Sequence, residues 1–206
     1  MSDIEEVDFD DPVLMARITL SELKRFYDEA TKHFDAQFAR LEMCAKSTLP
    51  EDDDESEYLS VMMEELEGMS DLVQKFGVIG IYRTFEIFLR KAVGRQRKAG
   101  AVISGQTARY VDKLKDQLKE IGVELTQPPF QWQEITKLRE IRNCIAHNEG
   151  WVDKESASIL RSYGLPAEEG HCLKLPKGYF LEALELVDKT CELIIEKCGE
   201  ARKQGG

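Results

Sequence analysis

The chain lacks three features that would place it in a class at once: a long apolar run, an export leader and paired cysteines. No apolar stretch approaches the ~18 residues that a membrane-spanning helix needs. The first residues, MSDIEEVDFDD, are acidic and lack the basic and then apolar layout of a signal peptide. We therefore expect a cytoplasmic protein without membrane contact.

The cysteines are few and scattered, which bears on disulfides and on metal sites. Their number is odd and no CxxC pair occurs. They are Cys44, Cys144, Cys172, Cys191 and Cys198. Without an export leader we interpret them as free thiols, several of them small core residues. His171 adjoins Cys172, but a zinc site needs paired ligands at short spacings. The sequence predicts no metal and no other cofactor.

Negative charge dominates, with 39 Asp and Glu against 28 Lys and Arg and a net charge of −11. Residues 1–70 carry 20 acidic and 6 basic side chains, a net −14, whereas residues 83–119 carry 10 basic and 3 acidic ones, a net +7. Such a basic segment can hold phosphate locally. We then expect the acidic N-terminal third either to face away from the basic segment or to act as an internal mask over it. The alternative is a solvated helix face with opposite charges paired at i and i+4.

Apolar residues recur at spacings of three and four along most of the chain, which predicts an all-α bundle of about five helices. We expect these helices at residues 13–46, 57–96, 107–121, 131–146 and 179–203. Residues 1–11 are expected to be disordered, and residues 12–204 to form a single domain. The proline and acidic block of residues 47–56 predict a solvated linker.

Three stretches of this bundle carry more specific expectations. Residues 79–93 are apolar on much of the helix circumference, which predicts the central buried helix. An interruption is expected around Gly77 and Gly80, which indicate either a kink or the close approach of another helix. Residues 150–178 are long for a structureless loop, so we expect local structure or a functional role there. Weak alternation at residues 171–175 favours a short strand or strand pair.

One helix carries a cluster of polar side chains beside its apolar stripe. At ~100° per residue the stripe is formed by Leu138, Ile141 and Ile145. The neighbouring polar sector holds Arg139, Arg142, Asn143 and His147. An arginine at the border of the stripe and a histidine at the helix end can clamp a phosphate and move its protons. The structural alternative is a helix-end cation and an arginine whose stem packs on the core.

The string LREIRNCIAHNEG at residues 138–150 resembles the signature of the HEPN superfamily (higher eukaryotes and prokaryotes nucleotide-binding). That signature is an arginine, commonly a polar residue, and a histidine after four to six residues. Arg142, Asn143 and His147 match it, and the following Asn148 and Gly150 are common in prokaryotic members. Within that superfamily the string is most similar to prokaryotic, toxin-like ribonucleases of the RiboL-PSP or MAE type.

Helix order extends the resemblance to roughly residues 57–203, although the specific motif covers only residues 139–150. In many HEPN proteins an earlier aromatic-rich helix passes beside the motif. Residues 79–93 are similar to that helix and contribute Tyr82, Phe85, Glu86 and Phe88. The resemblance therefore implies a HEPN-like helical bundle.

The resemblance also implies an activity, because active HEPN proteins are metal-independent endoribonucleases. They usually act as homodimers in which two motifs form one composite site. His147 would exchange protons with the ribose 2′-hydroxyl or the leaving 5′-oxygen, and Arg142 would stabilise the transition state. Asn143 would orient the histidine or a phosphate oxygen. The further substrate-site residues implied are Arg139, Asn148 and Glu86, the last as a partner of Arg142 or His147.

Three hypotheses follow for the function. The first is a homodimeric HEPN ribonuclease with RNA as substrate, acting in a toxin–antitoxin pair or in antiviral defence, with an antitoxin or defence protein as a further partner. The second is a non-catalytic HEPN module that binds nucleotide, nucleic acid or a partner protein. The third is an unrelated helical adaptor in which His147 is only a helix-end cation.

Overall fold

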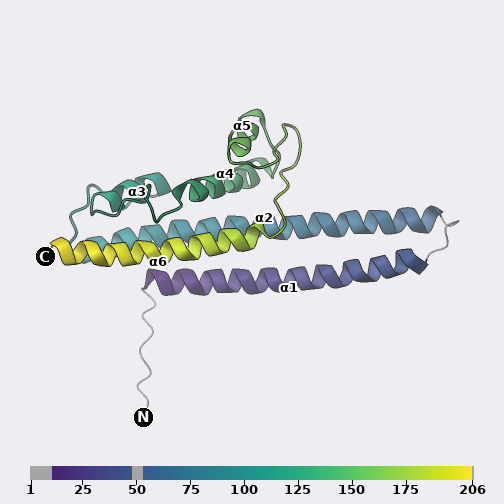
Figure 1. Ribbon diagram of the computed structural model, residues 1–206, viewed down its shortest axis with the longest axis horizontal. Helices are drawn as coiled ribbons and strands as arrows, with labels where there is room; N and C mark the ends of the chain where they lie inside the picture. Colours follow the sequence, from purple (N-terminus) through teal and green to yellow (C-terminus); the bar gives the residue numbers. More distant parts are fainter. Residues whose placement is uncertain (1–10, 48–52, 206) are drawn as a thin grey trace, which may run out of the picture.

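A computed structural model describes residues 11–47 and 53–205 of the chain. Helices are the only extended elements among these residues, so the all-α prediction is confirmed. They are α1 Pro12–Ser47, α2 Asp53–Lys98, α3 Val111–Lys119, α4 Trp132–Asn148, α5 Lys154–Ser162 and α6 Tyr179–Gly205. In Figure 1, α1, α2 and α6 run along one another, while α3, α4 and α5 lie on the opposite side of α2 from α1. No described helix combines the length and apolar character that crossing a bilayer requires.

Helix α2 is the centre of the bundle, as residues 79–93 predict. It contacts α1, α3, α4 and α6. Its second half buries a set of apolar side chains almost completely: Val78, Ile81, Tyr82, Phe85, Phe88, Leu89, Ala92 and Val93. Removing this much apolar surface from water holds the other helices against α2.

Two glycines of α2 allow other helices to approach closely. The helix runs through Gly77 and Gly80 without a break, so the expected interruption is wrong and the close approach is correct. A Cβ atom on Gly77 would overlap the ring of Phe180 in α6, and one on Gly80 would lie 3.0 Å from Leu23 in α1. Phe180 also stacks on Tyr27, with ring centroids 4.1 Å apart. Helices α1, α2 and α6 therefore meet at this point.

Helix α1 and the first half of α2 project beyond the other helices as an antiparallel arm (Figure 1). Because α1 continues to Ser47 and α2 begins at Asp53, the connection is shorter than the predicted linker. Most of the predicted disordered segment lies outside the described residues, but Asp11 caps α1 by accepting the Val13 N–H at 2.8 Å. The described part of the acidic block, residues 53–56, thus belongs to the arm, at the far end of α2 from α3.

The connection after α4 holds a helix, α5, where the sequence predicts only local structure of unspecified kind. Helix α5 begins after Asp153, whose Oδ1 accepts the Ser156 N–H at 2.7 Å. The predicted short strand or strand pair is reduced to a single antiparallel bridge between Trp151 and Cys172. Residues 150–178 are therefore an ordered cover on α4 and α2.

A buried lysine anchors this cover to α2. The Nζ atom of Lys75 lies 2.6 Å from Asp71 Oδ2 and 3.1 Å from Cys172 Sγ. Burial lowers the pKa of Lys75, but the hydrogen bonds with Asp71 and Cys172 outweigh it and the net direction is upward, so this lysine stays charged. Gly150 packs beside it with φ +83°, a conformation that disfavours any side chain.

Candidate functional site

Helix α4 positions the motif because one of its faces is anchored in the core. Its buried residues are Ile135, Leu138, Ile141, Cys144 and Ile145. The helix ends in the left-handed conformation at Glu149, with φ 54°, and the Gly150 N–H donates to the Cys144 carbonyl at 3.2 Å. This ending fixes where the last turn stops, and His147 lies in that turn.

The structure brings Arg142, Asn143 and His147 together. Arg142 Nη1 donates to Asn143 Oδ1 at 3.0 Å and lies 3.4 Å from His147 Nε2. Arg142 and Asn143 are half-buried, whereas His147 is exposed. A guanidinium with a partly desolvated stem and an exposed imidazole are thus in contact at the end of one helix.

The chemistry of the Arg142–His147 contact follows from the donors available. A guanidinium can only donate, so this contact is a hydrogen bond when His147 Nε2 carries its lone pair and Nδ1 carries the proton. Such a histidine presents a proton acceptor beside a fixed positive charge. An anion arriving between the two side chains would meet both.

Asn148 has a structural partner. Its Nδ2 donates to Asp153 Oδ2 at 2.9 Å, and Asp153 in turn caps α5. The Asp153 pKa lies below its ordinary value because the Ser156 N–H donates to the carboxylate. Asn148 therefore ties the end of α4 to the start of α5, a role that the motif alone does not reveal.

Arg139 and Glu86 also have partners of their own. Arg139 lies 2.7 Å from Asp112 of α3 and 3.0 Å from Glu140. The ion pair of Glu86 is with Arg83, at 3.4 Å, and not with either predicted partner in the motif. The guanidinium expected as a second phosphate contact is thus paired with two carboxylates, and the ion pair of Glu86 lies within its own helix.

A small pocket lies beside the histidine, between α4 and α5. It has a volume of about 200 Å³ and is lined by Asn143 and His147 on one side and by Ser156 and Ile159 on the other. Because α5 forms one wall, the shape of the site depends on the connection that folds over α4. Nothing in the motif predicts this wall.

Tyr82 of the aromatic-rich helix lies close to the charges of the site. The side chain is buried, and this burial, followed by the negative charge of Glu86, raises the pKa of Tyr82 above its ordinary value. Arg139 and Arg142 act on the same hydroxyl in the opposite direction. The expectation that residues 79–93 pass near the motif agrees with this arrangement and with the contact between α2 and α4.

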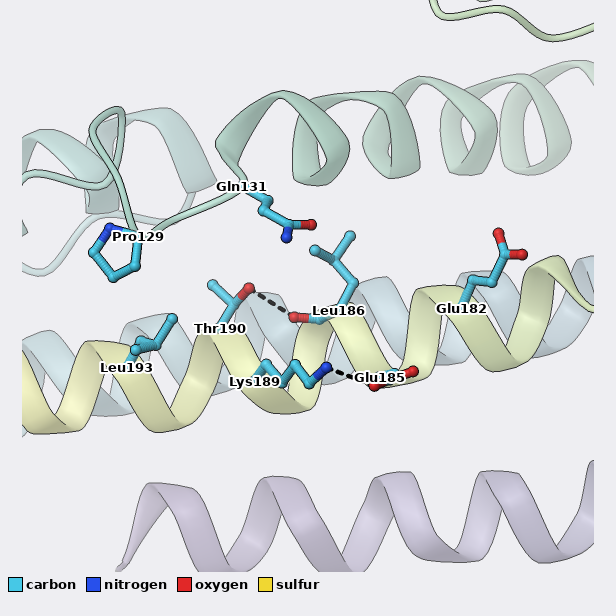
Figure 2. A pocket seen from close by; sticks show the side chains of 8 residues that line it. All are labelled: Pro129, Gln131, Glu182, Glu185, Leu186, Lys189, Thr190 and Leu193. Carbon is cyan, nitrogen blue, oxygen red and sulfur yellow. Dashed lines mark hydrogen bonds and ion pairs between the residues drawn. The ribbon is translucent and has the colours of Figure 1, made fainter.

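A second, larger pocket lies far from the motif (Figure 2). It has a volume of about 340 Å³ and lies between the turn at Pro129 and helix α6. Two of its polar side chains have partners in their own helix, α6. Lys189 lies 2.6 Å from Glu185, and the Thr190 hydroxyl donates to the Leu186 carbonyl at 2.7 Å. This pocket adjoins the start of α4, ~24 Å along that helix from His147, so it is no part of the site.

The basic segment 83–119 forms the end of the molecule opposite the acidic arm (Figure 1). Some of its cations have intramolecular partners: Lys119 lies 2.7 Å from Glu124, and Arg97 donates to the Ser104 carbonyl at 3.0 Å. Others are exposed, among them Lys91, Lys98 and Lys113. The acidic half of α2 is thus separated from the basic segment, whereas Asp11, just before α1, lies 3.5 Å from Arg95 of that segment.

No family model, curated protein or solved structure matches the chain. Within the described residues, no three His, Cys, Asp or Glu side chains gather as the ligands of a metal ion would. The functional assignment therefore depends on the chemistry of Arg142, Asn143 and His147 and on the motif that contains them.

Proposed function

We propose that the protein is a metal-independent endoribonuclease of the HEPN type, in which Arg142 and His147 act on RNA. The observation that carries this proposal is the 3.4 Å contact between Arg142 Nη1 and His147 Nε2 at an exposed helix end. A histidine that accepts a proton and an arginine that binds phosphate are the two groups that cleavage by the ribose 2′-hydroxyl needs.

In the proposed reaction a phosphate of the RNA replaces His147 as the partner of the Arg142 guanidinium. His147 Nε2 takes the proton of the 2′-hydroxyl, and the 2′-oxygen attacks the adjacent phosphorus. The bond from phosphorus to the 5′-oxygen breaks, and that oxygen receives a proton. The products are a 2′,3′-cyclic phosphate and a 5′-hydroxyl. The nucleophile belongs to the substrate and is already near its target, so no metal is required to generate it.

One imidazole cannot take the first proton and give the second at the same moment. A homodimer resolves this, because His147 of one copy serves as the base and His147 of the other as the acid. Asn143 holds Arg142 through its Oδ1 and so keeps the guanidinium beside the histidine. A toxin–antitoxin pair or antiviral defence is the setting proposed for this activity, with an antitoxin or defence protein as partner.

The test is RNA cleavage in EDTA by the wild type and by three alanine variants. We expect His147→Ala to lower the rate by about 10²- to 10⁴-fold, because it removes proton transfer. Arg142→Ala should lower it by about 10²- to 10³-fold, because it removes charge stabilisation. His33→Ala is the matched control, since His33 is an exposed histidine of α1 outside the motif and its loss should leave the rate unchanged.

Circular dichroism of each variant shows whether the helices remain intact. Equal cleavage by wild type and His147→Ala would refute the assignment of the histidine. A folded dimer that cleaves neither total RNA nor tRNA would favour the non-catalytic HEPN module.

A further inference from the structure

One face of α2 is apolar and uncovered over much of its length. Five large side chains of the arm half lie within a sector of ~80°, and each is exposed: Tyr58, Val61, Met69, Leu72 and Phe76. In Figure 1, α1 lies on one side of α2 and α3 to α5 on the other, with α6 in front. A helix stripe of this kind normally packs against another helix, and an exposed one marks a contact surface.

The same face continues into the second half of α2 with a different character. Ile79, Arg83, Ile87 and Arg90 occupy the same sector, and Ile87 and Arg83 are exposed. Charge divides along the helix: residues 53–74 hold eight Asp and Glu and no Lys or Arg, whereas residues 75–98 hold seven Lys and Arg and one Glu. A parallel copy of this helix would be repelled, whereas an antiparallel copy is complementary.

We infer that this face of α2 binds the same face of a second copy, antiparallel and about a two-fold axis near residue 74. In this register Leu72 lies opposite Phe76 of the second copy, and Met69 opposite Ile79. Glu65 then lies opposite Arg83, Val61 opposite Ile87, and Tyr58 opposite Arg90. Apolar side chains thus meet apolar ones in three of the pairs, Glu65 meets a basic side chain, and the Tyr58 ring meets the Arg90 guanidinium, a pairing that cation–π attraction favours.

This inference deepens the proposed function and rests on it, because the interface also pairs the two sites. A two-fold axis perpendicular to antiparallel helices keeps the same flank of each helix on the same side. Both copies of α4 would therefore lie on one side of the α2 pair. Lys75, one residue from the axis, packs against Gly150 at the end of α4. Both copies of His147 consequently lie near the axis, where one can act as acid and the other as base.

The first test is the mass of the full chain in solution, measured by light scattering after size exclusion. We expect a dimer for the wild type and a monomer for Phe76→Glu, because a carboxylate would be placed in the apolar centre of the contact. The matched control is Phe26→Glu in α1, which lies off this face. The two phenylalanines are similarly exposed, at 64% and 56%, so neither substitution should disturb the fold.

A charge exchange tests the register. Arg83→Glu and Glu65→Arg should each weaken the dimer, since each places two like charges opposite one another. The double variant with both changes should restore it, because the ion pairs re-form with opposite polarity. Dimers that tolerate Phe76→Glu, or a double variant no tighter than the single ones, would overturn this interface.

The outcomes separate this inference from the proposed activity. A wild-type dimer that depends on Phe76 but cleaves no RNA would leave the interface standing and remove the ribonuclease. Cleavage by a protein that is monomeric throughout would retain the ribonuclease and overturn the interface. If the wild type is a monomer and binds a basic amphipathic helix on this face of α2, the inference that a second copy covers the face is likewise overturned.

Discussion

His147 is held at its place by the neighbours that surround the last turn of α4. Arg142 contacts its ring, and the Asn148 side chain, one residue later, is bound to Asp153 of the α5 cap. Glu149 then turns the chain with φ 54°, a conformation that is uncommon for a non-glycine residue but frequent where a helix ends. The histidine is thus exposed to solvent but attached to a constrained backbone, which suits a group that must meet a substrate in one orientation.

The Asp153 carboxylate gives this constraint a pH dependence. Because the Ser156 N–H lowers the Asp153 pKa, its contribution to stability is present above the ordinary aspartate pKa of ~3.9 and is lost as the pH falls through the lowered value. We expect Asp153→Ala to lower the melting temperature by on the order of a few degrees at neutral pH. The difference from wild type should shrink below about pH 4.

Asp153→Asn provides the control, because an asparagine oxygen can still accept the Ser156 N–H but does not titrate in this range. Its stability relative to Asp153→Ala should stay constant with pH. Thermal unfolding followed by circular dichroism at several pH values measures both differences. A difference in melting temperature between wild type and Asp153→Ala that stays the same at acidic pH would contradict the role of Asp153 as the cap of α5.

At the scale of elements, periodicity predicted five of the six described helices, the nine-residue α3 among them, and failed for α5. Helices α1, α2, α4 and α6 each present an apolar stripe over many turns, which the sequence displays. Helix α5 has nine residues and only two buried side chains, too few to establish a period. The signal that the sequence does offer is its start, where Asp153 can cap the helix and Glu155 follows in the first turn.

The glycines of α2 show a second limit at this scale. Gly77 and Gly80 indicate a special position in the helix. They do not indicate whether the helix bends or another helix approaches, because the choice depends on residues distant in sequence. Phe180 and Leu23 decide the matter, and they lie in α6 and α1. Pairwise packing of this kind cannot be read from one segment alone.

Substituting Gly77 tests the packing of α2 against α6. Gly77→Ala should destabilise the protein by about 1–3 kcal/mol, since the added methyl group overlaps the buried Phe180 ring. Gly199→Ala in α6 is the matched control, because no atom lies within 4 Å of its added Cβ. That change should stabilise by up to about 1 kcal/mol through helix propensity. Urea unfolding measures both, and a stable Gly77→Ala would mean that α6 is not seated there.

For the molecule as a whole, the sequence predicted a charge division whose spatial meaning depends on the fold. The acidic residues of α2 belong to a projecting arm, and the basic segment forms the opposite end (Figure 1). Composition alone could not distinguish this arrangement from an acidic mask over the basic segment. The long uninterrupted α2 separates its own acidic half from the basic segment, whereas Asp11 before α1 is paired with Arg95.

The candidate site was predictable in its central residues and not in its surroundings. The contact among Arg142, Asn143 and His147 follows from their spacing on one helix. Arg139 and Asn148 occupy the same motif, but Asp112 and Asp153 bind them, and both aspartates come from other elements. Sequence spacing determines which side chains share a sector, whereas tertiary contacts determine which of them remain able to bind a substrate.

The most direct test of the central claim is the chemical nature of the ends left on cleaved RNA. Wild-type protein in EDTA should leave 2′,3′-cyclic phosphates and 5′-hydroxyls, because the 2′-oxygen is the nucleophile in the proposed reaction. Oligonucleotides with a 2′-deoxy sugar at the cleaved position should remain intact. Products with 3′-hydroxyl and 5′-phosphate ends, or cleavage of the 2′-deoxy substrate, would contradict the roles proposed for Arg142 and His147.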